Sequence, residues 1–169
     1  LDLKGFTALS NSTTGSKLVD LLNDAFDLVV PPVERGGGEI LKFMGDGYLA
    51  IFPYTSESEI AETAQRAVSS VREAQEAIAT YSGSRSLAFR AALHFGTFHY
   101  GNIGGASRLD FTAIGPPVNY AARLLSAAEP LGCDSVVSEK LAGLLPGVCD
   151  VAGEADLKGF DIRQVVYTF

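Results

Sequence analysis

The sequence has little of what disulfide-rich, membrane-spanning or exported proteins require. Its 169 residues hold two cysteines, Cys133 and Cys149, which form no CxxC pair. Two free thiols are typical of a reducing compartment, so we expect a cytoplasmic domain. No apolar run is long enough to cross a bilayer, and no basic start followed by an apolar stretch is present. We therefore expect no membrane contact by this domain.

Positive charge is also scarce. The chain has 13 Lys and Arg against 20 Asp and Glu, a net charge of −7. This balance argues against a nucleic-acid partner, because such a surface needs a basic stripe. It leaves a nucleotide ligand open, since a few placed cations and metal ions can hold one triphosphate on an acidic protein. Neither a Gly-x-x-x-x-Gly-Lys phosphate loop nor a nucleophile elbow is present.

Hydrophobic periodicity predicts one domain over residues 1–169. Helices and hairpins are mixed, which favours an α+β fold: a mostly antiparallel sheet with a ferredoxin-like βαββαβ core and helices packed on the sheet. The opening Leu-Asp-Leu reads as the second half of a strand, so we expect a truncated N-terminal strand and a longer native protein. The predicted helices are 18–29, one from Ser56, one from Pro116, and 141–145; the predicted strands are 39–43, 48–52, 87–95, 100–103 beside it, 135–137 and 165–169.

Local signals mark where these elements begin and end. Pro31 and Pro32 should end the first helix, because proline lacks a backbone N–H. Ser56 followed by Glu59 is the pattern of a capping box. Gly45-Asp46-Gly47 indicates a tight hairpin turn. In the helix from Pro116 the apolar spacing predicts a buried stripe of Val118, Ala121, Ala122 and Leu125.

Two carboxylates form the first candidate site. Asp2 follows the strand start and Asp46 lies in the hairpin turn, so they meet if that strand pairs beside the hairpin. Adjacent carboxylates repel each other unless a cation lies between them. Two divalent ions held by oxygen ligands would relieve this repulsion and could clamp phosphates. Taken alone, the two residues also fit an ordinary Asp-Gly turn and an unrelated surface Asp.

Two further features are compatible with phosphate chemistry. The loop Lys4-Gly5-Phe6-Thr7 leads toward a helix and could present backbone N–H groups to phosphate oxygens, although glycine is common in such turns. Asn119 and Arg123 are four apart on one helix face. Arg123 could stabilise a transferring phosphoryl group, or it could be a solvated surface residue.

Four other polar residues carry weak signals of their own. Lys42 lies in an apolar strand four residues before Asp46, and Lys158 lies in a Leu-Lys-Gly turn. Solvent exposure explains either lysine equally well. His94 and His99 share no metal-ligand spacing with cysteine or a second histidine, so we interpret both as structural.

Taken together, five motifs resemble those of class III adenylyl and guanylyl cyclase catalytic domains, in the family's order. The resemblance runs from Leu1 to Phe169, and five ordered motifs are far more specific than any one alone. The motifs are Asp-Leu-Lys-Gly-Phe-Thr (2–7), Lys-Phe-Met-Gly-Asp (42–46), His-Phe-Gly with Gly-Asn-Ile-Gly (94–96 and 101–104), the stretch from Asp110 to Arg123, and Leu-Lys-Gly (157–159).

The resemblance implies a role for each matching residue, with two divalent metal ions (Mg²⁺ or Mn²⁺) as cofactors. In this family the metal residues come from one subunit and the base, ribose and transition-state residues from the other, so the resemblance implies a homodimer with two shared active sites. The implied metal ligands are Asp2, Asp46 and the Leu3 carbonyl. The resemblance further implies that Gly5, Phe6 and Thr7 hold the β- and γ-phosphates and that Lys158 holds the terminal phosphates. It implies that Lys42 and Thr112 bind the base, that Asn119 orients the ribose and that Arg123 stabilises the transition state.

The residue pair that would read the base favours ATP as substrate and 3′,5′-cyclic AMP as product. A Lys42 ammonium can donate to adenine N1 and a Thr112 hydroxyl can accept from N6. Guanine presents a donor at N1, which would leave the lysine charge unpaired. Guanylyl cyclases of this pattern carry glutamate and cysteine at the two positions. Many members have Asp where this chain has Thr112, and the threonine version resembles the subgroup that includes bicarbonate-responsive cyclases.

Several alternatives remain at this point. The domain could be a guanylate cyclase, or a cyclase-like module that binds nucleotide and regulates without turnover, although neither metal Asp nor the Arg is missing. A diguanylate cyclase should carry Gly-Gly-Asp/Glu-Glu-Phe at the turn, where this chain has Met44-Gly45-Asp46-Gly47. A non-enzymatic dimerisation module would not need so many correctly spaced polar residues. Fused sensor or regulatory domains are compatible with every one of these functions.

Overall fold

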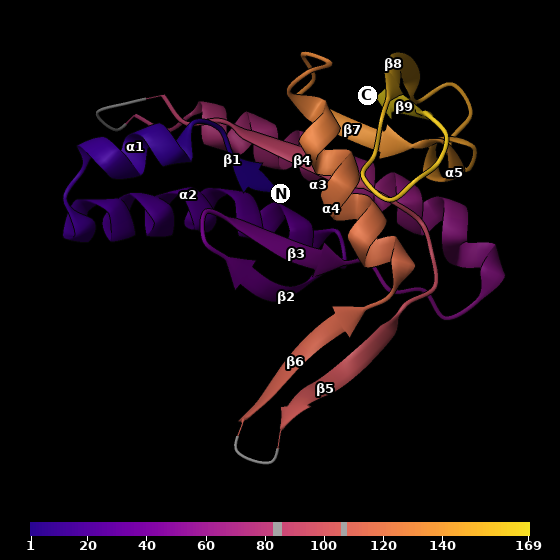
Figure 1. The fold of residues 1–169 in the computed structure, drawn as a ribbon, viewed down its shortest axis with the longest axis horizontal. Coiled ribbons are helices and arrows are strands. Elements are labelled where there is room, and N and C mark those ends of the chain that lie inside the picture. Colours follow the sequence, from indigo (N-terminus) through magenta and orange to yellow (C-terminus); the bar gives the residue numbers. More distant parts are fainter. Residues whose placement is uncertain (83–85, 106–107) are drawn as a thin grey trace.

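The computed structural model describes residues 1–82, 86–105 and 108–169 (Figure 1). Its centre is a seven-stranded sheet in the order β2-β3-β1-β4-β7-β9-β8. Among these strands β4 and β7 pair in parallel, and the other neighbours pair antiparallel. The predicted α+β class with a mostly antiparallel sheet is thus confirmed. The strands are β1 (Asp2–Leu3), β2 (Glu39–Met44), β3 (Gly47–Ile51), β4 (Phe89–Leu93), β7 (Ser135–Ser138), β8 (Asp150–Ala155) and β9 (Gln164–Thr168).

Helices cover both faces of the central strands. Strand residues alternate between faces, so on β7 Val137 belongs to one hydrophobic cluster and Val136 to another. The larger cluster is formed with α2 and α3, and the smaller with α4. Both clusters keep β7 buried along its whole length. The helices are α1 (Phe6–Ser12), α2 (Gly15–Arg35), the 3₁₀ turn η1 (Glu57–Glu59), α3 (Ile60–Ala79), α4 (Pro116–Ala128) and α5 (Glu139–Ala142).

Helix α2 runs through the two prolines that were expected to end it. Pro31 and Pro32 lie inside the helix, which ends at Arg35. Proline lacks a donor, but its carbonyl still accepts, and Gly36 N–H donates to the Pro32 carbonyl over 3.1 Å. Pro32 and Val33 are buried, so packing of the last turn offsets the two lost donors. The prediction of a helix end at Pro31 was wrong.

The β2–β3 hairpin was predicted to within a residue at each end. Met44 pairs with Gly47, which leaves Gly45-Asp46 as the two-residue turn. Gly45 has φ 64°, a conformation that favours glycine. A Cβ at Gly47 would lie within 2.1 Å of the Leu1 carbonyl oxygen, so only glycine lets β1 pack beside the turn.

Strand β5 (His99–Gly105) does not join the central sheet as expected. It pairs with β6 (Arg108–Ile114), and the expected pairing of residues 100–103 beside β4 was wrong. Figure 1 shows the β5–β6 hairpin projecting away from the rest of the molecule. Its described side chains leave four large apolar groups exposed, by 39–50%: Tyr100, Ile103, Phe111 and Ile114.

Smaller differences concern helix ends and faces. The Ser56 side chain makes no capping hydrogen bond; instead Glu59 accepts from the backbone N–H of Thr55 over 2.9 Å. The short helix α5 ends at Ala142, three residues before the predicted end. On α4 the buried residues are Leu124, Ala127 and Ala128, not the predicted stripe. That stripe is half-buried at Val118, Ala121 and Leu125 and exposed at Ala122, because α4 packs mainly through its C-terminal half.

Two further observations concern the cysteines and the lengths of the helices. In the described part of the chain Cys133 and Cys149 are free. No helix among the described residues is long and apolar enough to cross a membrane.

Candidate active site

The two candidate metal aspartates lie together, as the pairing argument predicted. Strand β1 lies between β3 and β4, with Asp2 opposite Gly47 on one side and Arg90 on the other. The backbone N–H of Leu3 donates to the Asp46 carbonyl over 3.1 Å, which ties the turn to β1. Burial, followed by the charge of the Asp46 carboxylate and a hydrogen bond with it, raises the pKa of Asp2. These carboxylates therefore form a site of concentrated negative charge.

Arg90 is a site neighbour that sequence analysis missed. It is the cross-strand partner of Asp2 on β4, and its charge acts to lower the pKa of that aspartate. Its guanidinium also contacts Glu129 at the end of α4, with Nη2 and Oε1 3.2 Å apart, and its side chain is only 22% exposed. The sequence feature that could have identified Arg90 is its position as the one charged residue of the otherwise apolar strand β4. Arg90 links the aspartate strand to the helix that carries Asn119 and Arg123.

The loop after Asp2 opens a short helix. Gly5 is the N-cap of α1 with φ 70°, and no side chain caps this end. The N–H groups of Phe6 and Thr7 lie in the first turn, where helical N–H groups have no acceptor within the helix. Lys4 anchors the loop from outside, because its ammonium forms an ion pair with Asp134 before β7. The loop is therefore held while its first-turn N–H groups stay available to an anion.

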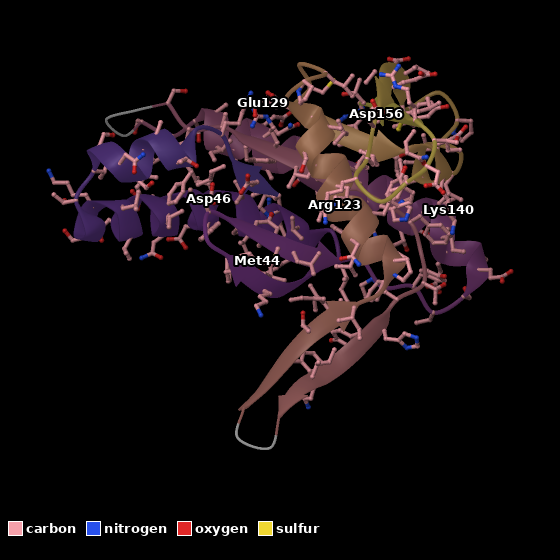
Figure 2. The ribbon with its side chains drawn as sticks, viewed as in Figure 1. Met44, Asp46, Arg123, Glu129, Lys140 and Asp156 are labelled. Carbon is pink, nitrogen blue, oxygen red and sulfur yellow. The ribbon has the colours of Figure 1, made fainter. Side chains whose placement is uncertain are left out.

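Helix α4 presents Asn119 and Arg123 to solvent. Both residues are exposed, while the next residue, Leu124, is fully buried. The helix starts with Pro116 and Pro117 in its first turn, as predicted. Figure 2 shows Asp46 and Arg123 well apart, the first on the hairpin and the second on α4. One copy of the chain therefore does not bring Arg123 to the two aspartates.

The two residues expected to read the base lie on neighbouring elements. Lys42 is on β2 next to a register shift that begins after Ile40, and it is half-buried. Thr112 is on β6 opposite Gly101 and is also half-buried. Strand β2 contacts β6, and the Tyr100 hydroxyl donates to Glu39 over 3.4 Å. The base of the projecting hairpin is thereby held against the strand that carries Lys42.

Lys158 lies in the connection between β8 and β9. It is exposed, but the preceding Leu157 is buried in the smaller cluster beside Leu124. A turn follows, in which Phe160 N–H donates to the Leu157 carbonyl over 3.0 Å and Gly159 has φ 93°. The buried Leu157 thus fixes the point at which the Lys158 side chain projects from the surface.

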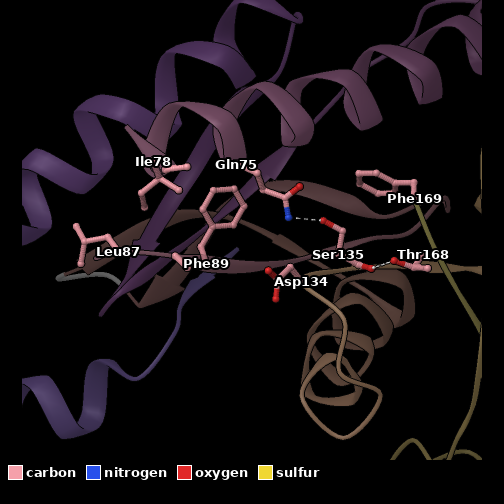
Figure 3. A pocket seen from close by; sticks show the side chains of 10 residues that line it. Gln75, Ile78, Leu87, Phe89, Asp134, Ser135, Thr168 and Phe169 are labelled. Carbon is pink, nitrogen blue, oxygen red and sulfur yellow. Dashed lines mark hydrogen bonds between the residues drawn. The ribbon is translucent and has the colours of Figure 1, made fainter. Parts of the chain in front are cut away.

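Two hollows described in the protein lie away from these residues. One, of about 360 Å³, lies between α3 and the strands β4, β7 and β9, where Gln75 donates to Ser135 over 2.8 Å (Figure 3). The other, of about 290 Å³, lies along α1 and α2. No predicted site residue lines either one. Within the described ranges no group of three or more His, Cys, Asp or Glu could hold a metal ion.

Comparison with known proteins gives one consistent match. The family model described as "Adenylate and Guanylate cyclase catalytic domain" matches residues 1–169. An adenylate cyclase of Anabaena cylindrica is 26% identical over 143 residues, which cover 83% of this chain and 28% of that protein. The chain thus spans little more than a quarter of that relative's length.

Two solved structures show the same architecture. The adenylyl cyclase CyaB from P. aeruginosa superposes with a TM-score of 0.85 and 29% identity, covering 98% of this chain and 88% of that one. The guanylyl cyclase Cya2 superposes with a TM-score of 0.79 and 27% identity, covering 98% and 86%. Structures named for either base are therefore similar to this chain, and similarity alone does not select the nucleotide.

Proposed function

This chain belongs to the adenylate and guanylate cyclase catalytic-domain family, and we propose that it converts ATP to 3′,5′-cyclic AMP and pyrophosphate at sites shared between two copies of the chain. Such an enzyme is a lyase that makes a cyclic nucleotide. The observation that carries the proposal is the contact between Asp2 and Asp46 in a chain that also carries Lys42 and Thr112.

The two aspartates suit a pair of divalent cations. Burial and then the charge of Asp46 raise the pKa of Asp2, and a cation between the two carboxylates would offset their repulsion. Carboxylate and carbonyl oxygens are the ligands that Mg²⁺ and Mn²⁺ prefer, and Leu3 follows Asp2 in β1 and donates its backbone N–H to the Asp46 carbonyl. Two carboxylates leave room for phosphate oxygens as further ligands. When bound, the ions would polarise the phosphates and lower the pKa of the ribose 3′-hydroxyl.

The reaction needs little else from the chain than placement and charge. The 3′-oxygen bonds to the α-phosphorus while the bond to the β-phosphate oxygen breaks, so that pyrophosphate leaves with the electron pair and the hydroxyl proton passes to solvent. The first-turn N–H groups of α1 and Lys158 would hold the β- and γ-phosphates. Asn119 would orient the ribose, and Arg123 would neutralise charge that develops on the transferring group.

A second copy supplies what one copy lacks. Asp46 and Arg123 lie apart within the chain (Figure 2), so a complete site requires the α4 surface of another copy. The projecting β5–β6 hairpin exposes Tyr100, Ile103, Phe111 and Ile114, and grouped exposed apolar side chains are typical of protein–protein interaction sites. Closed two-fold symmetry would pair each aspartate site with a partner helix and give two sites per dimer.

The proposal is tested by incubating the protein with ATP or GTP and either Mg²⁺ or Mn²⁺, and measuring cyclic product. We expect cyclic AMP from ATP, with GTP a poor substrate because Lys42 would face a guanine donor. Preferential formation of cyclic GMP would make the protein a guanylate cyclase. Tight nucleotide binding without product from either would make it a regulatory module.

A further inference from the structure

Tyr120 stands between the two proposed substrate contacts of α4, Asn119 and Arg123, yet it points into the protein. Its ring stacks on His94 with centroids 4.3 Å apart and planes at 29°. Its other side meets Phe160 edge-on, with centroids 5.0 Å apart at 87°. Its hydroxyl donates to the side-chain oxygen of Gln164 over 3.3 Å. One side chain thus contacts the end of β4, the connection after Lys158 and the start of β9.

His94, on which the Tyr120 ring stacks, is itself held by a hydrogen bond. Its Nδ1 lies 2.8 Å from the Ser138 hydroxyl oxygen, and Ser138 is fully buried. That oxygen also accepts the backbone N–H of Leu141 over 3.3 Å, so the hydroxyl ties the imidazole to the start of α5. Burial and then the nearby Lys140 charge lower the pKa of His94 to about 4. The imidazole is therefore neutral near pH 7, which suits stacking on a phenol ring.

The connection from Asp156 to Arg163 has few other attachments near Lys158. Leu157 is buried, but Phe160 is 41% exposed and Ile162 is 74% exposed. Beyond the turn itself, Arg163 at the end of the connection makes ion pairs with Glu154 and Asp156 at its start. Among the described contacts, Tyr120 is the aromatic group that holds this connection against α4.

We propose that Tyr120 is a positioning residue that docks the Lys158 connection on α4, so that Lys158, Asn119 and Arg123 keep a fixed spacing at the triphosphate. The inference rests on the proposed function and adds a residue to it. The Tyr120 side chain contacts Phe160 and Gln164 on the side of the Lys158 connection, and its ring stacks on His94. Tyr120 acts through its neighbours and need not touch the nucleotide.

The test compares three variants of the whole chain. Tyr120→Leu removes the ring and the hydroxyl, whereas Tyr120→Phe keeps both ring contacts. Tyr81→Leu is the matched control, because Tyr81 is also a half-buried tyrosine whose hydroxyl donates to a side chain far away in the sequence, that of Asp24 in α2, over 3.3 Å. We expect Tyr120→Leu to lower kcat/KM for ATP by about 10-fold or more, since small displacements of positioning groups have large effects. Tyr120→Phe and Tyr81→Leu should stay within about 3-fold of wild type.

A double-mutant cycle separates positioning from general damage. If Tyr120 acts through Lys158, then Tyr120→Leu should cost clearly less in a Lys158→Ala background than in wild type. Hydrogen exchange of the amides in residues 157–163 should speed up in Tyr120→Leu and not in Tyr81→Leu, a readout that needs no turnover. Equal losses in both backgrounds with unchanged exchange would overturn the inference. A wild type without cyclase activity would refute the proposed function, and the exchange result would then decide the docking role alone.

Discussion

The two hydrophobic clusters support different parts of the proposed active site. The larger cluster joins α2 and α3 to the sheet and contains Leu3, next to Asp2, whereas the smaller one contains Leu124 and Leu157, the immediate neighbours of Arg123 and Lys158. Within the smaller cluster, buried Leu124 directly follows exposed Arg123, and buried Leu157 directly precedes exposed Lys158. The larger cluster therefore supports the aspartate strand, and the smaller one holds α4 and the Lys158 connection, so the spacing of Arg123 and Lys158 rests on the smaller cluster.

The largest effect should come from the pair of aspartates, which belongs to neither cluster. Asp46→Asn should reduce cyclisation by about 10³-fold or more, because a metal ligand and its charge are lost. Burial and then the charge of Asp46 raise the pKa of Asp2, and the same change removes that neighbouring charge. The variant should therefore melt at a higher temperature than wild type in chelator and gain less from Mn²⁺. Wild-type turnover, or an undiminished Mn²⁺ shift in the melting temperature, would argue against the metal assignment.

Base selection is the next largest effect and concerns the side of the sheet where β2 meets β6. The double change Lys42→Glu with Thr112→Cys should shift the ATP-to-GTP ratio of kcat/KM toward GTP by about 100-fold or more, since donors and acceptors are exchanged. The ratio is measured with both nucleotides in wild type and variant. An active variant that still prefers ATP would show that other groups read the base, while a wild type that prefers GTP would refute the assignment outright.

A matched pair of core truncations sharpens the division between the clusters. Ile78→Ala in the larger cluster and Leu124→Ala in the smaller one remove similar buried side chains and should each cost about 2–5 kcal/mol of unfolding free energy. Well below the melting temperature, Leu124→Ala should also lower kcat/KM by about 10-fold, because α4 shifts with Arg123. Ile78→Ala should leave the turnover of the folded protein unchanged. Equal losses of activity would mean that the clusters are not separate in function.

The smallest effect is a pH dependence of stability at His94. Its pKa is about 4 in the folded protein, below the ordinary 6.5, so the unfolded chain binds more protons between these values. Unfolding free energy should then be fully present above about pH 6.5 and decline as the pH falls toward 4. Urea unfolding of wild type and His94→Gln between pH 7.5 and 4.5 measures this contribution. A decline of the same size in the variant would assign it to other groups.

Much of the fold was predictable from sequence, and the reasons for the rest are local. The turn at Gly45-Asp46 and the adjacency of Asp2 followed from strand pairing, because few registers bring those two residues to one edge. The site roles themselves rest on ordered motifs and stay predictions. The periodicity of residues 100–103 identified a strand but not its partner, since strand patterns carry no information on which neighbour is close. Arg90 was missed for the same reason, as its importance comes from facing Asp2 across the sheet.

The central claim, that ATP is cyclised at sites completed by a second copy, is tested most directly by mixing two inactive variants. Asp46→Asn lacks the metal side and Arg123→Ala lacks the α4 side, so a mixed dimer has one intact site and one doubly damaged site. With free subunit exchange, half of the dimers are mixed, and cyclic AMP formation should recover to about a quarter of the wild-type rate. No recovery, with subunit exchange demonstrated by differently labelled copies, would contradict a shared site.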